Sequence, residues 1–243
     1  MPEGPSIVLL KEAAAIFTGK KVLSVTGNSK QDIGRAAGRK IIAFKSWGKH
    51  FLICFKDFTI RVHFMLFGSY RINEERDMKR RMALTFTNGT FNFYACSVKI
   101  IDEPLDEVYD WSTDIMSPQW DAAKALKKLK AKPNMLAADA ILDQNIFSGA
   151  GNIFKNEVLF RIRIHPLSRI GSLPQRNLKQ LVSEVHTYAF EFMEWKRNYV
   201  LKKHWLAHTK IICPRCHIPF IKEHLGKTNR RSFFCNNCQV LYD

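Results

Sequence analysis

Apolar and polar positions along the chain follow two different periods. In residues 7–17 the apolar side chains recur at near-helical spacing and Gly19 follows, which predicts a leading amphipathic helix with Ser6 as its cap. From residue 21 to residue 101 the apolar positions instead fall into short runs rich in β-branched and aromatic residues, which predict strands. These runs are residues 22–25, 40–44, 51–55, 59–64, 69–72, 82–86 and 90–94.

The dipeptide Asn88-Gly89 separates the last two runs and is a strong signal for a β-hairpin. The whole stretch predicts a sandwich or a small barrel. Residues 102–118 are acidic and contain two prolines, which predicts a linker. After this linker the helical period returns, in residues 120–131, 133–142, from 146 onward, 152–162 and from 174 onward.

The pattern therefore predicts an α+β protein of three parts. Residues 1–118 form a β-sandwich with a leading helix, residues 119–208 a helical domain, and residues 209–243 a small cysteine-rich module. Hydrophobic residues make up 46% of the 243 positions, which is enough for packed cores and argues against disorder. No apolar run is long enough to span a bilayer, and the first residues do not resemble a signal peptide. We therefore expect a protein that is neither secreted nor bound to a membrane.

The charge of the chain restricts its partners. Lys and Arg number 38 against 22 Asp and Glu, a net charge of +16. Such an excess favours a polyanionic partner, with nucleic acid first and an anionic membrane surface second.

Four of the six cysteines form two CxxC pairs separated by eighteen residues. Four thiolates at this spacing are typical of one structural, tetrahedral Zn²⁺ held by both ends of a short hairpin. These cysteines are Cys213, Cys216, Cys235 and Cys238. The alternatives are four unrelated cysteines, or a histidine ligand from His217 or His224. The segment between the pairs carries Lys222, Lys227, Arg230 and Arg231, which suits contact with phosphates.

Two further segments suggest anion chemistry and nucleophilic chemistry. Gly149-Ala150-Gly151-Asn152 precedes a predicted helix, whose free N–H groups could bind an anion; an ordinary helical corner is the alternative.

At the start of the chain, removal of Met1 would expose Pro2 as a free secondary amine. An α-amino group has a pKa near 8, against about 10.4 for lysine, so a useful fraction is neutral and nucleophilic. Glu3 could shuttle protons beside it, unless the terminus is simply frayed.

These motifs occur in one order in a known group of proteins. With Gly48-Lys49, and with Asn156-Glu157 after the glycine turn, the chain resembles the formamidopyrimidine-DNA glycosylase and endonuclease VIII family over nearly its whole length. The resemblance implies a helix–two-turn–helix in the helical domain and a C-terminal zinc ribbon. It implies base-excision repair of double-stranded DNA that contains a damaged base or an abasic site. It requires no catalytic cofactor beside the structural zinc.

The resemblance also assigns roles to residues. It implies that Pro2 attacks C1′ of the damaged nucleotide and that Glu3 is the general acid/base. Lys49 matches a lysine that the family carries on a strand after a glycine. The resemblance implies that this lysine contacts phosphate and assists protonation at the lesion. It implies that Asn152 holds the DNA backbone and that Arg230, five residues before the third cysteine, grips phosphates. The adjacent Arg231 is the alternative, and the spacing favours Arg230. A wedge that fills the space left by a flipped nucleotide matches Met65, Leu66 and Phe67. Without the resemblance, these three apolar residues would be assigned to the core.

The family's endonuclease VIII branch is the better match, because Gly4 stands where the other branch usually has leucine and because the opposite-strand Arg-Phe-Gly element is missing. Oxidised pyrimidines are therefore the expected lesions, followed by β,δ-elimination; specificity for 8-oxoguanine or formamidopyrimidine is the alternative. Ser6 replaces a second glutamate that many members carry.

A non-catalytic damage sensor and an RNA-binding zinc-ribbon protein are rival interpretations. We expect a monomer, located in the bacterial cytoplasm and nucleoid or in the eukaryotic nucleus.

Overall fold

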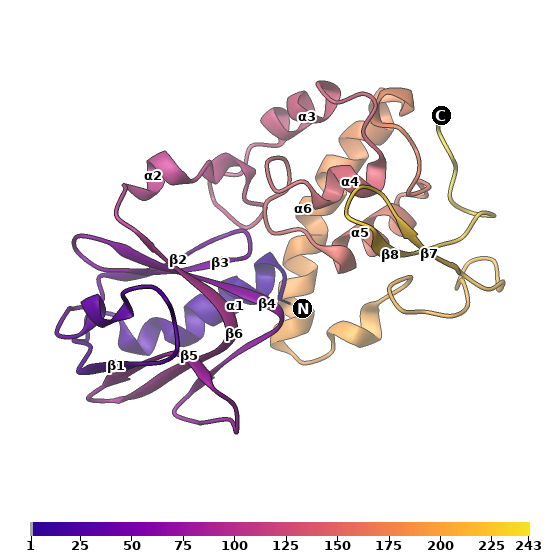
Figure 1. The fold of residues 1–243 in the computed structure, drawn as a ribbon. Helices are drawn as coiled ribbons and strands as arrows, with labels where there is room; N and C mark the ends of the chain where they lie inside the picture. Colours follow the sequence, from indigo (N-terminus) through magenta and orange to yellow (C-terminus); the bar gives the residue numbers. More distant parts are fainter. Residues whose placement is uncertain (1) are drawn as a thin grey trace. The chain divides into compact units, whose positions relative to one another are not determined.

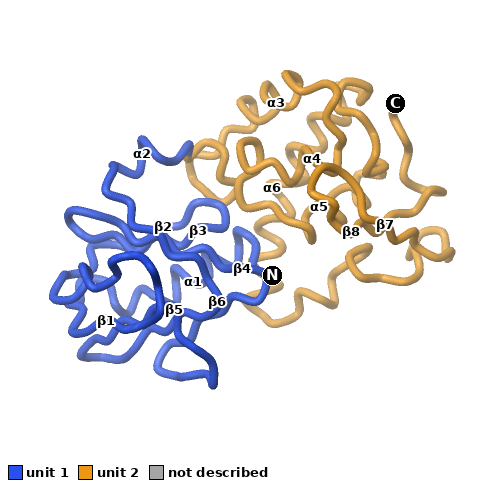
Figure 2. Tube along the Cα trace, in the orientation of Figure 1, with its two compact units in different colours: residues 1–110 blue, residues 111–243 orange. Residues whose placement is uncertain are grey.

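A computed structural model describes residues 2–243, and Met1, whose removal the sequence analysis expects, lies outside the described residues. The chain forms two compact units, residues 1–110 and residues 111–243 (Figure 2). The boundary falls inside the stretch predicted as a linker, residues 102–118. The cysteine-rich segment from residue 209 belongs to the same unit as the helices. The predicted three-part division, with boundaries at 118 and 208, stays a prediction.

The first unit contains one six-stranded antiparallel sheet with the strand order β1-β5-β6-β4-β3-β2 (Figure 1). Two of its strands are much longer than the others and pair with each other along most of their length. The strands are β1 Ser24–Thr26, β2 Ala43–Trp47, β3 His50–Cys54, β4 Thr59–Ile72, β5 Arg80–Phe86 and β6 Gly89–Ile101. Two of the predicted runs, 59–64 and 69–72, are therefore a single strand.

The long strands bend where their pairing is interrupted. The register between β4 and β6 shifts between Phe64 and Ser69. Opposite this bulge, Ala95 has a positive φ of 46°, and a Cβ on Gly68 would lie 2.9 Å from the Ala95 carbonyl oxygen. Bulges bend and twist a sheet, so this interruption is the place where β4 and β6 are expected to bend. The predicted β-sandwich with a leading helix is confirmed.

The leading helix α1, Gly4–Ala14, contributes Ile7, Leu10 and Ala14 to the sandwich core. It begins earlier than the sequence predicts. Pro5 occupies the first turn, where a missing N–H is harmless. The predicted cap at Ser6 is wrong, because Ser6 lies inside the helix and its N–H donates to the Glu3 carbonyl oxygen at 2.8 Å.

The predicted hairpin at Asn88-Gly89 is confirmed between β5 and β6. Phe86 pairs with Gly89 across a two-residue turn, and Gly89 has a φ of 145° that favours glycine. A side-chain bond from Asn88 Nδ2 to the Ile16 carbonyl oxygen, 3.0 Å long, ties this turn to the segment that follows α1.

The second unit is mainly helical and ends in a two-stranded sheet. Its elements, with the short helix that ends the first unit, are α2 Leu105–Val108, α3 Ala122–Lys130, α4 Ala137–Leu142, α5 Asn152–Arg161, α6 Gln175–Arg197, β7 Ile221–Leu225 and β8 Arg230–Phe234. Short 3₁₀ turns lie at Ala15–Phe17, Ile33–Ala36, Trp111–Thr113, Ile170–Ser172 and Leu201–His204. Among the residues that the structure describes, no helix has the length and apolar character to cross a membrane.

The helix predicted from residue 146 is not formed, and side chains explain why. Gln144 Nε2 donates to the carbonyl oxygens of Leu142 and Ala150 at 2.8 and 3.0 Å, while its Oε1 accepts from the Gly149 N–H at 3.1 Å. Such local bonds offer the backbone an alternative to helical pairing. The resulting loop delivers the chain to α5, whose residues 153–160 are all buried.

Candidate metal centre and nucleic-acid interface

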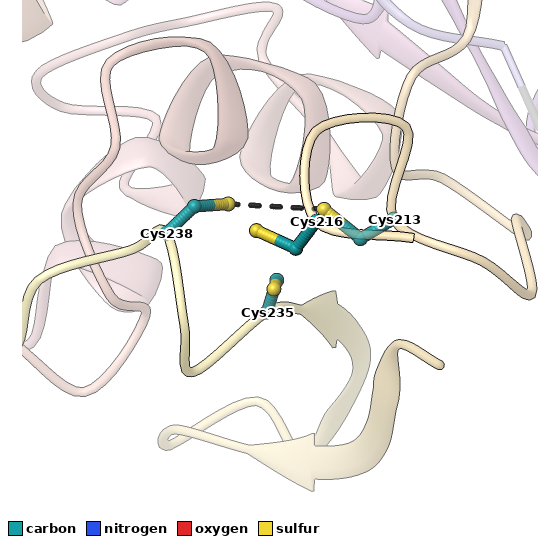
Figure 3. A group of neighbouring side chains, drawn as sticks. All are labelled: Cys213, Cys216, Cys235 and Cys238. Atoms are coloured by element: carbon teal, nitrogen blue, oxygen red, sulfur yellow. Dashed lines mark hydrogen bonds between the residues drawn. The ribbon is translucent and has the colours of Figure 1, made fainter. Parts of the chain in front are cut away.

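Four cysteine side chains converge in the second unit, as Figure 3 shows. Cys213 and Cys216 lie on one loop, while Cys235 and Cys238 lie on the loop that follows β8. Their sulfur atoms all lie within 4.8 Å of one another. The cluster therefore brings together the four residues that the sequence predicts as ligands, and neither His217 nor His224 belongs to the group.

The geometry of the cluster fits a tetrahedral zinc ion. Cys213 Sγ and Cys238 Sγ are 3.8 Å apart, too far for a disulfide and equal to the edge, about 3.8 Å, of a tetrahedron with Zn–S bonds of about 2.3 Å. Burial raises the pKa of the Cys238 thiol to about 12, so binding of a divalent cation must also displace protons. Four sulfur ligands would complete the coordination shell of such an ion, which indicates a structural role.

The cysteine module is fastened to the end of α5 by an arginine. Arg215, between the first two cysteines, donates to the carbonyl oxygens of Phe160 and Arg161 at 2.8 and 3.2 Å. Its guanidinium also lies 4.0 Å from the centre of the Phe160 ring. A cation at the C-terminus of a helix satisfies carbonyl groups that lack helical partners. The metal centre and α5 are therefore parts of one assembly.

The start of α5 lies against the strand that carries the two arginines. Asn152 Nδ2 donates to the Arg231 carbonyl oxygen at 3.0 Å, whereas Asn152 Oδ1 is buried and receives no hydrogen bond from the described residues. Arg230 and Arg231 are both exposed on β8. The structure thus brings Asn152 together with the arginine pair, as a common phosphate-binding role would require.

Three polar residues of α5 are functional candidates that the sequence analysis did not assign. Lys155, Asn156 and Glu157 are 1%, 3% and 0% exposed. Glu157 accepts from the backbone N–H groups of residues 206, 207 and 208 at 2.8, 3.0 and 2.7 Å, and Asn156 Oδ1 accepts from the Phe233 N–H at 3.0 Å. The available signal was a run of three polar residues inside an otherwise apolar helix, since buried polar groups need partners.

In the first unit, the predicted nucleophile and its neighbour precede α1. Pro2 is half-buried, and Glu3 is fully buried at the N-cap with extended backbone, φ −117° and ψ 172°. A fully buried carboxyl group at an N-cap does not fit the alternative of a frayed segment. The helix therefore fixes the position from which Pro2 projects.

Lys49 lies in the tight turn between β2 and β3, one residue before the strand. Trp47 pairs with His50 across Gly48-Lys49, and Gly48 supplies a positive φ of 51°. The Trp47 indole donates to the Asp110 carbonyl oxygen at 3.0 Å and packs 4.9 Å from the Tyr109 ring. These contacts hold the Trp47 side of the turn that contains Lys49.

The surroundings of Lys49 are electropositive and contain two histidines. Burial, followed by the charges of Arg61, His63 and Lys49, lowers the pKa of His50 to about 3. The pKa of His63 is also lowered, by burial first and by the same two cations. Both imidazoles are therefore neutral near pH 7, and the positive charge in this region belongs to Lys49 and Arg61.

The three residues predicted as a wedge lie on the bulge of β4 and face solvent. Met65, Leu66 and Phe67 are 55%, 54% and 80% exposed, whereas the preceding Phe64 is 4% exposed. The alternative assignment of these residues to the core is wrong. Three adjacent exposed apolar side chains are rare on a protein surface and indicate a contact site.

Two family models match this chain. Residues 1–96 match the formamidopyrimidine-DNA glycosylase N-terminal domain, and residues 112–196 match the formamidopyrimidine-DNA glycosylase H2TH domain.

Curated relatives carry related names. Endonuclease 8-like 3 of Bos taurus is 27% identical over 98% of this chain and 40% of its own length. Endonuclease 8-like 2 of Mus musculus is 33% identical over 74% of this chain and 57% of its own length. The formamidopyrimidine-DNA glycosylase of Acinetobacter baylyi is 26% identical over 99% of both chains. The chain thus spans about two fifths of the first of these relatives.

Solved structures share the fold at lower identity. A viral DNA glycosylase and the Lactococcus lactis formamidopyrimidine-DNA glycosylase bound to AP-site-containing DNA both give a TM-score of 0.85 with 18% identity. Each match covers 98% of this chain and at least 99% of the other. With two domains of one family matched in order and relatives from both of its branches, the chain belongs to the formamidopyrimidine-DNA glycosylase and endonuclease VIII family.

Proposed function

We propose that the protein is a bifunctional DNA glycosylase and AP lyase of base-excision repair, with Pro2 as its nucleophile. The observation that carries this proposal is the N-terminus: a proline preceding a fully buried glutamate at the start of a helix that is packed into the sandwich core. Family membership supports the reaction class, and the buried Glu3 at the start of a packed helix supports the assignment of Pro2.

The proposed reaction begins at C1′ of the damaged nucleotide. The neutral Pro2 nitrogen forms a bond to C1′, and the base leaves with the electron pair of the glycosidic bond and takes up a proton. Opening of the sugar ring gives an iminium ion, which acidifies the C2′ hydrogens. Loss of a C2′ proton then breaks the C3′–O bond, and a second elimination breaks the C5′–O bond. Water finally releases the proline.

Glu3 and Lys49 are the proposed proton-transfer groups. Glu3 adjoins the nucleophile in sequence and is held by α1, so its carboxyl group can accept and return the protons of the amine and the sugar. Lys49 projects from a turn that Trp47 fastens on one side. The neighbouring histidines carry no charge near pH 7, since burial lowers the pKa of both. Of the two cations in this region, we assign phosphate contact and leaving-group protonation to Lys49, because Lys49 matches the lysine of the family.

The remaining assigned residues bind DNA and do no chemistry. Phe67 and its two neighbours would enter the stack when the nucleotide leaves, which offsets an unstacking cost of a few kcal/mol. In the second unit, Asn152 and Arg230 would bind the backbone beside the lesion. The four cysteines would hold one Zn²⁺, whose contribution is to fix the short hairpin that carries the arginines.

We propose oxidised pyrimidines as the preferred lesions. The proposal rests on the endonuclease VIII-like start of the chain and on the sequence after the β5–β6 hairpin, where Ala95 to Lys99 contain no Arg-Phe-Gly element. The names of the relatives include both branches and do not decide between them. Excision of 8-oxoguanine or formamidopyrimidine is the second candidate.

Borohydride trapping tests the proposed nucleophile. A duplex with a single abasic site is incubated with the full chain and reduced, and the adduct is digested and analysed by mass spectrometry. We expect a covalent adduct on the Pro2 nitrogen of a chain that lacks Met1. A DNA-binding protein without catalysis gives no adduct, and an adduct on a lysine would assign the chemistry elsewhere. A cleavage panel with thymine glycol, dihydrouracil, 8-oxoguanine and formamidopyrimidine then tests the lesion class.

A further inference from the structure

A lysine is buried in the middle of α5, on the side that faces the arginine-bearing strand. Lys155 is only 1% exposed, although Phe154 and Val158 beside it belong to the apolar core of the unit. Burial of an ammonium group is expensive unless all its donors find partners. Methionine would fill similar space without this cost, so the ammonium group has to be explained by what it contacts.

All three acceptors around the Lys155 ammonium come from one short stretch of β8. Its Nζ lies 2.8 Å from Ser232 Oγ, 3.1 Å from the Arg231 carbonyl oxygen and 3.4 Å from the Arg230 carbonyl oxygen. An ammonium group has three N–H donors, and three acceptors surround it. Lys155 therefore holds the backbone of both arginines while their side chains remain exposed.

Other polar side chains hold the same hairpin on either side. Asn152 Nδ2 binds the Arg231 carbonyl oxygen, and Asn156 Oδ1 accepts from the Phe233 N–H at 3.0 Å. At the hairpin tip, Asp139 Oδ1 on α4 accepts from the Lys227 N–H at 2.9 Å. The backbone from residue 227 to residue 233 is thus fixed by hydrogen bonds from α4 and α5. Of these groups, only Lys155 brings a positive charge of its own.

We propose that Lys155 is a positioning residue for DNA binding, whose ammonium group fixes the Arg230–Arg231 backbone and so presents both guanidinium groups to the phosphates. The inference rests on the proposed function, since it requires that the arginines bind DNA. It goes beyond that function because Lys155 itself is too buried to reach a phosphate. A positioned arginine pair loses little side-chain and backbone freedom on binding, which raises affinity.

The charge of Lys155 also links DNA binding to pH. Burial lowers the pKa of Lys155 to about 8, while Asp139 on α4 raises it and Arg230 on β8 lowers it further. His208, which faces Lys155 from the segment after α6, has a lowered pKa and is neutral at this pH. A DNA phosphate beside Arg230 would screen the repulsion between the two cations and favour the ammonium form. Binding above pH 8 should therefore take up a proton, and affinity should fall with rising pH.

The test compares Lys155→Met, which keeps the length of the side chain, with Lys155→Arg, which keeps the charge and its donors. Lys127→Met on the exposed face of α3 is the matched control for loss of one positive charge. The probe is a duplex with one tetrahydrofuran abasic analogue. We expect Lys155→Met to weaken binding about tenfold or more. The slope of log Kd against log salt should also decrease by the equivalent of one to two lost phosphate contacts, each of which contributes about 0.9 to the slope. Lys155→Arg should restore most of the affinity, and the control should change it less than threefold.

Two readouts separate positioning from a general structural role. In a double-mutant cycle, Arg230→Ala should cost little further affinity once Lys155 is methionine. The wild type should lose affinity between pH 7.5 and 9.5, whereas Lys155→Met should show a flat profile. Additive losses together with an unchanged pH profile would overturn the proposal, as would a Lys155→Met protein that binds as tightly as the wild type.

If Lys155→Met does not fold or does not retain zinc, Ser232→Ala removes one of the three acceptors and leaves the charge in place. Ser232→Ala should weaken DNA binding about threefold and lower the apparent pKa seen in the dependence of affinity on pH. If neither the affinity nor this apparent pKa changed, the proposal would be overturned. Failure of the proposed function looks different, because the wild type itself would then show no preference for the abasic-site duplex.

Discussion

The residues assigned to chemistry and the residues assigned to DNA binding are held in contrasting ways. Pro2 precedes a helix, Lys49 lies in a two-residue turn and Phe67 lies on a bulge, so all three project from irregular backbone of the first unit. In the second unit, Asn152 and Lys155 are tied to the backbone of β8, and four cysteines close the same hairpin.

This difference predicts different responses to substitution. A group that projects from irregular backbone can be removed with little change in folding, because few other contacts depend on it. A group inside a hydrogen-bonded network cannot, because its partners are left buried and unsatisfied. Changes at Pro2, Lys49 and Phe67 should therefore separate activity from stability, whereas changes at Asn152 and Lys155 should alter affinity and stability together.

The largest effect is expected from blocking the N-terminal amine. A short peptide left in front of Pro2 turns the amine into an amide, which has no nucleophilic electron pair. Cleavage of an abasic-site duplex should fall by at least about 10³-fold, since the nucleophile is lost entirely. Single-turnover kinetics measures this loss, and binding of an uncleavable duplex should change less than about tenfold. An extended protein that cuts at the normal rate would remove Pro2 from the mechanism.

The next largest effect is expected at the metal centre, where Cys235→Ser removes one ligand. Because structural zinc binding is worth roughly 10–16 kcal/mol in small metal-dependent domains, the hairpin should lose its order. Affinity for the abasic-site duplex should fall on the order of 10²-fold, since the arginines lose their fixed backbone. Atomic absorption should give one zinc per chain in the wild type and much less in the variant.

If zinc loss left DNA affinity unchanged, the contrast between the DNA-binding residues of the second unit and the catalytic residues of the first would be wrong. Calorimetry provides the control: the unfolding transition of the first unit should persist in Cys235→Ser, because its core contains no cysteine of the cluster. Cys54→Ser, in the first unit, is the matched substitution and should not alter zinc content.

The sequence predicted the two regions unequally. The cysteine spacing predicted the four-cysteine cluster, and Gly149 to Asn152 predicted the start of α5, because spacing in sequence determines geometry in these short motifs. The sequence did not predict that Lys155 and Asn156 bind β8, more than 70 residues away in the chain. Contacts between distant segments depend on packing, and the local pattern of apolar and polar residues does not reveal them.

The strands show the same limit. Short apolar runs located β3 and β5 closely and overlapped parts of β1 and β2. They covered only the first part of β6 and divided β4 in two at Met65 to Gly68. The division marks a real feature, the register shift between Phe64 and Ser69. A bulge interrupts the alternation of buried and exposed positions without ending the strand, so the sequence pattern shows a gap where the backbone continues. For the same reason the pattern did not show whether the three wedge residues are buried or exposed.

A smaller effect is expected from alanine substitution of two phenylalanines, Phe64 and Phe67, that are three positions apart. Phe67 is 80% exposed and Phe64 is 4% exposed. Phe67→Ala should change the free energy of unfolding by less than about 0.5 kcal/mol, whereas Phe64→Ala should cost roughly 3–5 kcal/mol. Excision of a damaged base from a duplex should fall roughly tenfold in Phe67→Ala, equivalent to about 1.4 kcal/mol of lost wedge stabilisation.

Cutting at a preformed abasic site in single-stranded DNA provides the control for Phe67→Ala. No stack has to be opened there, so the rate should stay within about twofold of the wild type. Equal losses on both substrates would mean that Phe67 acts on the chemical step and not on nucleotide extrusion. Denaturant unfolding of both phenylalanine variants measures the difference in stability directly.

The last effect concerns acid stability and not activity, and it compares one buried histidine in each unit. The pKa of His50 is lowered to about 3, mainly by burial, and that of His208 to about 4 by burial and then by Lys155. Below pH 6.5 the unfolded chain takes up a proton at each position and the folded chain does not. The free energy of unfolding should therefore decrease as the pH falls, by up to about 1.4 kcal/mol per pH unit for each histidine.

His50→Phe should reduce this pH dependence in the first unit, because the ring packs among Trp47, His63 and Tyr109 and its Nδ1 has no hydrogen bond within the described residues. His208→Gln should reduce it in the second unit but also lower stability at pH 7, since the ring lies 3.0 Å from Asn156 Nδ2 inside the network. Calorimetry between pH 4.5 and 7.5 distinguishes the two transitions. If both variants behaved alike at pH 7, the network would not set the second unit apart from the first.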